Sequence, residues 1–373
     1  MLQNKIYQNF FIEIFKTFFM ILFGLSLIAL TVRAVSFLDL IIENGYSTGI
    51  YLKFSLLNLF GIIPKFIPLS FLIALTLFVI KHLQDSEFII LWTSGVKKFD
   101  LLNLFFLSSL AVILLHIILS TFLTPLALNK SRQLLSNDNL NSFLPTIRTQ
   151  QFSDTFKGFT LFVEKKSDNE IKNIFLHDEG SNFKNLSSNI AEISTTTIFA
   201  ENGFIENRRI FLFNGQILTS KKNSDNEIVK FQQLSIDLTN LKTSTIKAAK
   251  IQETSTLKLL NCLIKNNNLD NICNEGFKKE IIPTLSRRII IPVYIPLIAI
   301  MVGLMLIKSQ KIYFNKILIF SYSFIILLFT ELAVRYTGIN NYVMLTFVIM
   351  PFLMFFLLYL FLIFKFSKEA ISS

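Results

Sequence analysis

The sequence predicts an α-helical polytopic membrane protein with six transmembrane helices and one inserted all-β domain. Two observations support this fold class. The 373-residue chain is 52% hydrophobic and only 16% charged, whereas a soluble domain carries about 25% charged residues. The apolar residues form long runs at the two ends, and the middle is rich in Ser, Thr, Asn and Lys. We therefore expect membrane blocks at 1–125 and 287–373, on either side of a water-soluble domain at 126–286.

Six apolar segments are long enough to cross a membrane, which takes about 20 residues. Pro64 and Pro68 interrupt the second segment, so we expect a kink there, or backbone groups that neighbouring helices satisfy. No small-residue cleavage site follows the first segment, so we expect it to remain as an anchor. The predicted spans are residues 10–32, 54–80, 101–124, 289–307, 317–334 and 343–364.

The basic residues predict the orientation, because short cytoplasmic loops carry an excess of Lys and Arg. With the N-terminus in the cytoplasm, only Arg33, Lys53 and Arg335 lie in the short segments on the other side. Both termini are then cytoplasmic in an inner-membrane protein, and residues 126–286 are periplasmic. The residues that this orientation places inside are Lys5, Lys16, Lys81, Lys97, Lys98, Lys308, Lys311, Lys316, Lys365 and Lys368.

The central domain shows the pattern of short β-strands. Its candidate strands are rich in β-branched and aromatic residues, and pairs of turn-forming residues separate them. This spacing is typical of a sandwich, a jelly roll or an open barrel. The segment 254–285 is expected to be helical and loop-like, and to return the chain to the membrane. The strand candidates are residues 159–163, 171–176, 196–200, 210–213 and 228–231, and the turn candidates are Asp168-Asn169, Asn202-Gly203, Asn214-Gly215 and Asp225-Asn226.

The chain lacks the signatures of an enzyme. No glycine-rich phosphate loop and no Gly-x-Ser-x-Gly elbow occurs, so ATP hydrolysis by this chain itself is not expected. The three histidines, His82, His116 and His177, are scattered, so we expect neither a metal site nor a cofactor. Cys262 and Cys273 are compatible with a disulfide in an oxidising compartment and equally with two free thiols. The net charge of +11 lies mostly beside membrane helices, where the positive bias of cytoplasmic loops accounts for most of it. An anionic lipid partner would account for some of the rest, and no nucleic-acid partner is expected.

The first functional candidate is the segment 86–98, between the second and third spans. Ser86 is suited to cap a helix and Gly95 to end it. The helix either offers a docking site for a partner protein or lies on the membrane surface. Glu87, an acid in an otherwise basic loop, favours the protein partner. The residues that recur at helical spacing and form one apolar face are Phe88, Leu91 and Trp92.

The second candidate is a set of arginines at the outer ends of three helices. Arg33 ends the first span, Arg287 and Arg288 precede the fourth, and Arg335 ends the fifth. Guanidinium groups suit phosphate because their planar donors bind two oxygens at once. These arginines therefore either surround an anionic head group or anchor the helices at the interface by snorkelling.

Two charged residues fall inside predicted spans, where charge is costly and usually faces a partner or a cavity. Glu331 lies four residues before Arg335, so a local pair between them is the simplest interpretation. Lys65 in the second span is either a substrate contact or a snorkelling residue.

Two sequence blocks resemble the lipopolysaccharide export permease family LptF/LptG, also called YjgP/YjgQ. The first runs from Pro68-Leu-Ser through Lys81 to Ser86-Glu87 and Gly95, and the second is Arg287-Arg288-Ile-Ile-Ile-Pro292. The order of three helices, a β domain and three helices also agrees with the family. The LptF branch is favoured by similarity in the runs 159–164, 174–179 and 231–238.

The resemblance implies a transport mechanism and three protein partners. The family forms a heterodimer of two permeases that encloses a lipid cavity. A dimeric cytoplasmic ATPase similar to LptB docks on coupling helices, here about 86–98. A periplasmic β-jellyroll, here 126–286, passes the lipid to a jellyroll of the LptC type.

The resemblance also assigns roles to individual residues. Glu87 is expected to face the ATPase, and the neighbouring positions are expected to shape that contact. Arg33 matches a basic position that lines the lipid cavity, and a second basic family position appears here as Leu30. The full set of expected site residues is Ser86, Glu87, Leu91 and Gly95 for ATPase coupling, and Arg33, Arg288 and Lys65 for lipid binding.

Three other classes of membrane protein are alternatives. Permeases of the lipoprotein-release or FtsX-like class have an extracytoplasmic domain and an ATPase partner, but their domain follows the first helix rather than the third. A membrane scaffold without a transport role needs neither arginines on several helices nor a coupling helix. An ion-driven secondary transporter is expected to have broken helices around a central acid, and Glu331 is not central.

Overall fold

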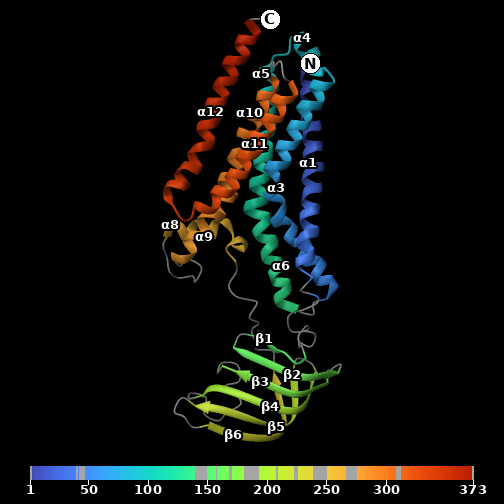
Figure 1. Ribbon diagram of the computed structural model, residues 1–373, viewed down its shortest axis with the longest axis vertical. Helices are drawn as coiled ribbons and strands as arrows, with labels where there is room; N and C mark the ends of the chain where they lie inside the picture. The colour runs from blue at the N-terminus through green and yellow to red at the C-terminus, as the bar shows by residue number, and fades with distance from the viewer. Residues whose placement is uncertain are drawn as a thin grey trace. The chain divides into compact units, whose positions relative to one another are not determined.

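The computed structural model consists of two compact units, which are described separately (Figure 1). A helical unit comprises residues 1–33, 56–130 and 250–373, and a sheet unit comprises residues 34–55 and 131–249. The structure describes residues 2–38, 41, 47–138, 149–156, 158–167, 170–179, 193–206, 209–221, 226–237, 250–265, 275–307 and 312–371.

Within the described residues, six helical segments are long and apolar enough to cross a membrane. Five of them contain a predicted span in full, and the fourth, Lys279–Leu306, ends one residue before the predicted span 289–307 does. Two of them are composite. The third span joins α5 and α6 through a π-helical segment, Leu119–Leu123, and the fourth joins α9 and α10 through a π-helical segment, Ser286–Ile290. The helices of the spans are α1 (Leu2–Ser36), α3 (Thr48–Gln84), α5 (Lys98–Ile118), α6 (Thr124–Asp138), α9 (Glu275–Leu285), α10 (Tyr294–Gly303), α11 (Ile312–Tyr336) and α12 (Asn341–Ile371).

The prolines inside these spans show how the helices pack. Proline has no N–H group, so it leaves unpaired the carbonyl four residues earlier in the helix. Helix α3 continues through Pro64 because the hydroxyl of Thr124 donates to the carbonyl of Phe60 at 2.7 Å. The prediction that neighbouring helices satisfy this backbone is therefore confirmed at Pro64.

The same compensation recurs at three more prolines. In each case a hydroxyl from another segment donates to the carbonyl that the proline leaves free, which fixes the register between the two segments. The donors and carbonyls are Thr256 to Thr121 before Pro125, Ser120 to Arg288 before Pro292, and Tyr294 to Phe347 before Pro351.

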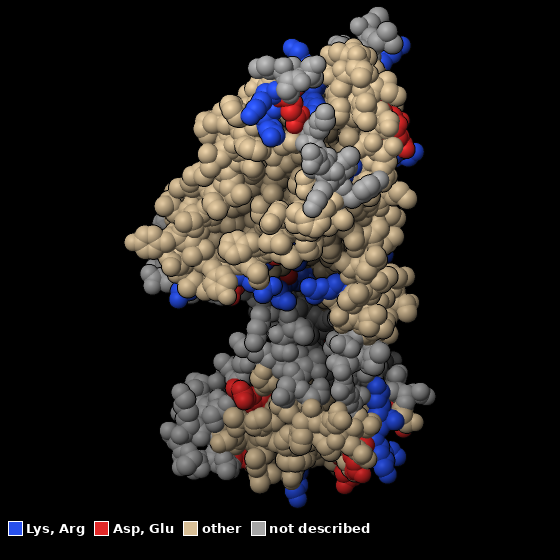
Figure 2. Space-filling view, turned by 45° about the horizontal axis from the view of Figure 1, so that its top comes forward, with Lys and Arg blue, Asp and Glu red and all other residues tan. Residues whose placement is uncertain are grey.

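The core of the helical unit is built mainly from α1, α3, α5 and α10, and α10 packs between α5, α11 and α12. Residues 294–303 of α10 are all buried, whereas α1, α11 and α12 expose large apolar side chains along most of their length. Figure 2 shows that the charged side chains on this face of the helical unit gather towards its two ends, with an uncharged wall between them. This is the surface expected of a protein that lies in a bilayer.

The sheet unit contains one antiparallel sheet of six strands in the order β1-β2-β3-β4-β5-β6. One face carries a core of aliphatic side chains, and β4 is its longest strand. Each described strand pairs only with the strands that precede and follow it in the sequence. Within the described strands, the predicted jelly roll is therefore an antiparallel meander. The strands are β1 (Phe152–Phe156), β2 (Phe159–Ser167), β3 (Glu170–Asp178), β4 (Ile193–Glu206), β5 (Arg209–Lys221) and β6 (Asn226–Asp237).

The five predicted strands all lie within β2–β6, but β1 was not predicted and two predicted turns are wrong. Asn202-Gly203 lies inside β4 and Asn214-Gly215 inside β5. Both glycines occur where another group approaches the backbone. A Cβ atom on Gly203 would meet the Phe211 carbonyl oxygen at 2.8 Å, and one on Gly215 would meet the ring of Phe231. These glycines therefore serve close packing rather than chain reversal. The turn predictions at Asp168-Asn169 and Asp225 lie outside the described residues.

The return segment is helical, as predicted. Helix α8 (Thr256–Lys265) packs Leu259 against Ile281 and Leu285 around α9. Cys262 of α8 is disulfide-bonded, so the alternative of two free thiols is excluded. The chain has one other cysteine, Cys273, which lies outside the described residues.

Candidate functional site

Three cationic side chains of the helical unit form one cluster, which we call the basic cluster. They are Arg33 in the last turn of α1, Lys65 in α3 and Arg287 in the π-helical segment after α9. Lys65 interacts electrostatically with both arginines and with Glu331 of α11. The structure thus brings two predicted lipid-binding residues, Arg33 and Lys65, together with an arginine from the second half of the chain.

Arg287 is the member of the basic cluster with a resolved ion pair. Its Nη2 atom lies 2.7 Å from Oε1 of Glu331. The predicted local pair between Glu331 and Arg335 is therefore wrong, because the Glu331 carboxylate pairs with Arg287 instead. The Nε atom of Arg287 is buried and has no hydrogen-bond partner in the described part of the chain. Three cations against one carboxylate leave this cluster with an excess of positive charge and a free donor, which suits a phosphate group.

Arg288, the third residue predicted to bind lipid, has different surroundings. It is only 4% exposed. Its Nη1 atom donates to the Thr254 carbonyl at 3.0 Å and to the Thr256 hydroxyl at 2.9 Å, and its Nη2 atom donates to the Gln252 carbonyl at 2.9 Å. The structure therefore does not bring Arg288 into the basic cluster. It holds the segment that leads into α8 against the start of the fourth span.

The predicted coupling segment forms a short helix, α4 (Glu87–Thr93), at the end of the helical unit where both chain termini lie (Figure 1). Ser86 precedes α4 but makes no side-chain cap, so the predicted capping role is wrong. Gly95 adopts φ +94° and ends the helix as predicted. The helix is shorter than the predicted segment 86–98, because the residues from Ser94 to Lys97 form a turn before α5 begins.

The apolar face of α4 points into the helical unit rather than outward. Phe88 is fully buried and Leu91 and Trp92 are half-buried against the core. The outward face presents Ile89 and Ile90, both exposed, beside the half-exposed carboxylate of Glu87. An apolar pair next to an acid is a surface that suits a protein partner with a complementary cation.

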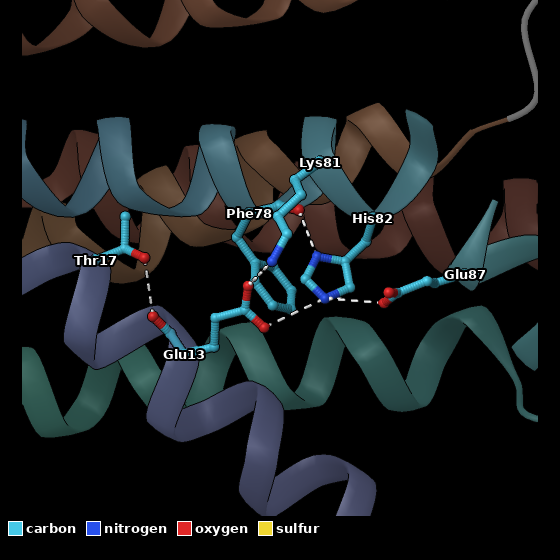
Figure 3. Close-up of polar contacts among 6 residues, drawn as sticks. All are labelled: Glu13, Thr17, Phe78, Lys81, His82 and Glu87. Atoms are coloured by element: carbon cyan, nitrogen blue, oxygen red, sulfur yellow. Dashed lines mark hydrogen bonds and ion pairs between the residues drawn. The ribbon is translucent and has the colours of Figure 1, made fainter. Parts of the chain in front are cut away.

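Behind α4 lies a group of four charged or ionisable side chains, Glu13, Lys81, His82 and Glu87, which we call the acid–histidine cluster (Figure 3). The Nε2 atom of His82 lies 3.4 Å from Glu13 Oε2 and 3.2 Å from Glu87 Oε2. The Nζ atom of Lys81 lies 2.6 Å from Glu13 Oε1. Glu13 comes from α1, Lys81 and His82 from α3, and Glu87 from α4. Sequence reasoning missed Glu13 and the role of His82, because nothing in the sequence ties Glu13 to residues that follow it by almost 70 positions.

A second ion pair joins the same end of the helical unit to the last helix. Lys98, the first residue of α5, lies 2.5 Å from Glu369 of α12, and its Nζ atom lies 4.6 Å from the ring centre of Trp92. Each side chain of this ion pair is about one-fifth exposed, and this shields it from salt. The contact attaches α4 indirectly to α12.

The sheet unit carries a row of phenylalanines on the face opposite to its aliphatic core. Phe152, Phe162, Phe175 and Phe199 are cross-strand partners on β1–β4, and the row continues with Gln216 and Lys230 on β5 and β6. Phe152 and Phe199 are exposed. A shallow groove of about 670 Å³ lies along part of this row, and its lining includes Phe162, Phe175 and Phe199 together with Glu201 and Lys230. The aromatic side chains of this lining suit an apolar ligand.

Within the described residues no group of His, Cys, Asp or Glu side chains is arranged to hold a metal ion. Residues 10–365 match the model of a protein family described as lipopolysaccharide export system permease LptF/LptG. A comparison with curated proteins finds no match.

Proposed function

Because the chain belongs to the lipopolysaccharide export permease family LptF/LptG, we propose that it is one permease subunit of an ATP-driven transporter that takes lipopolysaccharide out of the inner membrane. The family and the six apolar helices identify a multi-pass inner-membrane transporter rather than an enzyme. The observation that carries the proposal further is the basic cluster. It combines excess positive charge with the apolar wall of a spanning bundle.

Arg33, Lys65 and Arg287 are proposed to bind phosphates of the lipid head group. Charge-assisted hydrogen bonds to phosphate are about twice as strong as neutral ones. Glu331 holds Arg287 in place until a phosphate reaches its free Nε donor. Arg288 is proposed as a structural residue, because its donors are already used within the chain.

The outward face of α4 is proposed to dock the ATPase, a dimer similar to LptB, through Glu87. The supporting geometry is the half-exposed carboxylate beside Ile89 and Ile90. Leu91 contributes by holding α4 on the core, and Gly95 by ending the helix. Ser86 precedes the helix, but its side chain makes no capping hydrogen bond. With the ATPase in the cytoplasm, both termini lie inside and residues 126–286 lie in the periplasm.

The sheet unit is proposed to carry the acyl chains. Moving apolar chains into water costs about 0.8 kcal/mol for each CH₂ group. The phenylalanine row and its groove offer an apolar surface that lowers this cost. A second LptF/LptG-type permease and an LptC-like periplasmic protein complete the proposed path towards the outer membrane. Within the family, we propose the LptF branch for this chain, supported by the similarity in the runs 159–164, 174–179 and 231–238.

Docking of the ATPase is tested by co-purification in mild detergent. Glu87→Lys is expected to lower ATPase recovery about tenfold or more, because it places two cations against each other at the contact. Asp85→Lys is the matched control, since Asp85 is an exposed acid two residues away. Equal recovery with Glu87→Lys and wild type contradicts the docking site.

Lipid binding is tested by photo-crosslinking from a reactive residue placed on α1 near Arg33. Arg33→Glu is expected to reduce crosslinking of lipopolysaccharide, because a carboxylate repels phosphate. Lys53→Glu on α3 makes the same charge change at an exposed position outside the basic cluster, and crosslinking with this control is expected to stay near the wild-type level. Undiminished crosslinking with Arg33→Glu contradicts phosphate binding there.

The runner-up is a permease of the lipoprotein-release or FtsX-like class. Three spans precede the strands β1–β6 in this chain, whereas one precedes the domain in that class. A membrane scaffold without transport is a weaker candidate, because it has no use for the excess charge of the basic cluster.

A further inference from the structure

His82 is unusually deeply buried for a residue in the last turn of a spanning helix. It is only 2% exposed, and three phenylalanine rings surround it. The ring of Phe88 stacks on it at 5.3 Å, Phe78 lies at 4.2 Å, and Phe10 meets it edge-on at 4.9 Å. This packing fixes the plane of the imidazole, so its two nitrogens point in defined directions.

Both nitrogens of His82 face acceptors. Nδ1 lies 2.9 Å from the Phe78 carbonyl oxygen, which carries no proton, so Nδ1 is the donor. Nε2 faces one oxygen of Glu13 and one of Glu87, and carboxylates also only accept. His82 and Lys81 together therefore contact both carboxylates of the acid–histidine cluster.

Glu13 and Glu87 come from different helices and meet through His82 (Figure 3). The remaining oxygen of Glu87 is free to meet a cation of a partner, because the side chain is 49% exposed while its Oε2 atom faces the histidine. A partner that pulls on Glu87 therefore acts on His82, and through His82 on Glu13 and α1.

The other end of α1 carries Arg33 of the basic cluster. Glu13 and Arg33 are 20 positions apart in one continuous helix, which corresponds to about 30 Å. A tilt or shift of α1 at Glu13 is therefore carried directly to the proposed phosphate site.

We propose that His82 is a positioning residue that sets Glu87 for the ATPase and links movement of α4 to α1. The inference rests on the proposed function and assigns to that function the residue that connects its two sites. Neither Glu13 nor His82 touches the lipid, so their effect is on coupling rather than on binding.

The test compares His82→Phe with His82→Gln in the complete complex. Phenylalanine keeps the ring packing but removes both ring nitrogens, whereas glutamine keeps a donor near the position of Nε2. The measured quantity is the amount of lipopolysaccharide released for each ATP hydrolysed. His82→Phe is expected to lower this ratio roughly tenfold, the size of a typical coupling between two sites. His82→Gln is expected to restore part of it.

His116→Phe is the matched control, because His116 is equally buried in α5 and lies outside the acid–histidine cluster. It is expected to leave the ratio unchanged. Glu13→Gln is expected to lower the ratio as His82→Phe does, and the double variant is expected to be no worse than either, because both changes break the same link. A merely structural role would reduce the yield of complex but leave the ratio of the surviving complex normal.

A normal ratio with His82→Phe in a complex that retains the ATPase overturns the inference and leaves the proposed function intact. A low ratio with His82→Phe but a normal one with Glu13→Gln overturns the link to α1. Failure of the wild-type chain to hold an ATPase contradicts the proposed function itself, and the inference falls with it.

Discussion

The same two helices, α1 and α3, carry two charged clusters of opposite design. In the acid–histidine cluster, carboxylates and cations face each other across α1, α3 and α4 at 2.6–3.4 Å. In the basic cluster, Lys65 interacts electrostatically with Arg33, Arg287 and Glu331, and Arg287 pairs with Glu331. A buried donor of Arg287 has no partner within the described residues. The carboxylates of the first cluster have partners within the chain, and we propose that an anion binds to the second.

The difference shows how charge can be used in two ways within one bundle. A balanced network holds helices together and transmits movement, because each group has a partner that moves with it. An unbalanced cluster destabilises the bundle by repulsion among its cations and gains from binding an anion. The position of each cluster on shared helices is what allows an event at one to affect the other.

The largest expected effect separates two consecutive arginines, Arg287 inside the basic cluster and Arg288 outside it. Arg288→Ala should lower the free energy of unfolding by about 3 kcal/mol, because it leaves two carbonyls and a hydroxyl of residues 252–256 without their donor. Arg287→Ala should cost less than about 1 kcal/mol, as for an exposed ion pair, but should reduce lipid crosslinking.

Unfolding by titration with a denaturing detergent measures the first effect. Arg288→Lys is the control, since it keeps the charge but not the forked donors, and should remain destabilised. If Arg288→Ala were stable and defective only in lipid binding, Arg288 would belong to the basic cluster after all.

The second prediction compares the same lysine-to-glutamate change in each of the two clusters. Lys65→Glu and Lys81→Glu both lie on α3, 16 positions apart. Lys65→Glu should weaken lipopolysaccharide binding roughly tenfold, since a charge-assisted hydrogen bond contributes about 1.5–3 kcal/mol. Lys81→Glu should leave lipid binding within about twofold in the absence of ATP, because Lys81 pairs with Glu13 instead. Equal losses would show that the two clusters are not distinct in function.

The spanning helices were predictable from sequence, and the pairing within the clusters was not. Long apolar runs identify spans because each residue meets the bilayer independently of the fold. The partners of His82 and Arg287 are set by packing between helices, and a local rule gave Glu331 the wrong partner, Arg335. Arg33 and Lys65 were identified because charge inside or beside a span is costly wherever its partner lies.

The sheet shows the same limit. The strands β2–β6 were predicted from runs of β-branched and aromatic residues between turn-forming residues, but β1, with the sequence Phe-Ser-Asp-Thr-Phe, is too short and polar to stand out. Asn202-Gly203 and Asn214-Gly215 carry the strongest hairpin signal known for two residues, yet they lie inside strands because Gly203 and Gly215 admit close neighbours. Local sequence cannot distinguish a glycine needed for a turn from one needed for space.

The smallest expected effect removes Glu331, the one carboxylate shown to face the basic cluster within the described residues. Glu331→Gln should raise the affinity for lipopolysaccharide about two- to fivefold at low salt, because Arg287 no longer has a competing partner and surface ion pairs are worth up to about 1 kcal/mol. The gain should vanish in high salt, where screening shortens the reach of charge to about 3 Å. Glu13→Gln in the balanced cluster is the matched change and should leave the affinity as it was. A loss of affinity with Glu331→Gln would mean that Glu331 positions Arg287 for the phosphate rather than competing with it, and the excess of charge would then not be what draws the lipid.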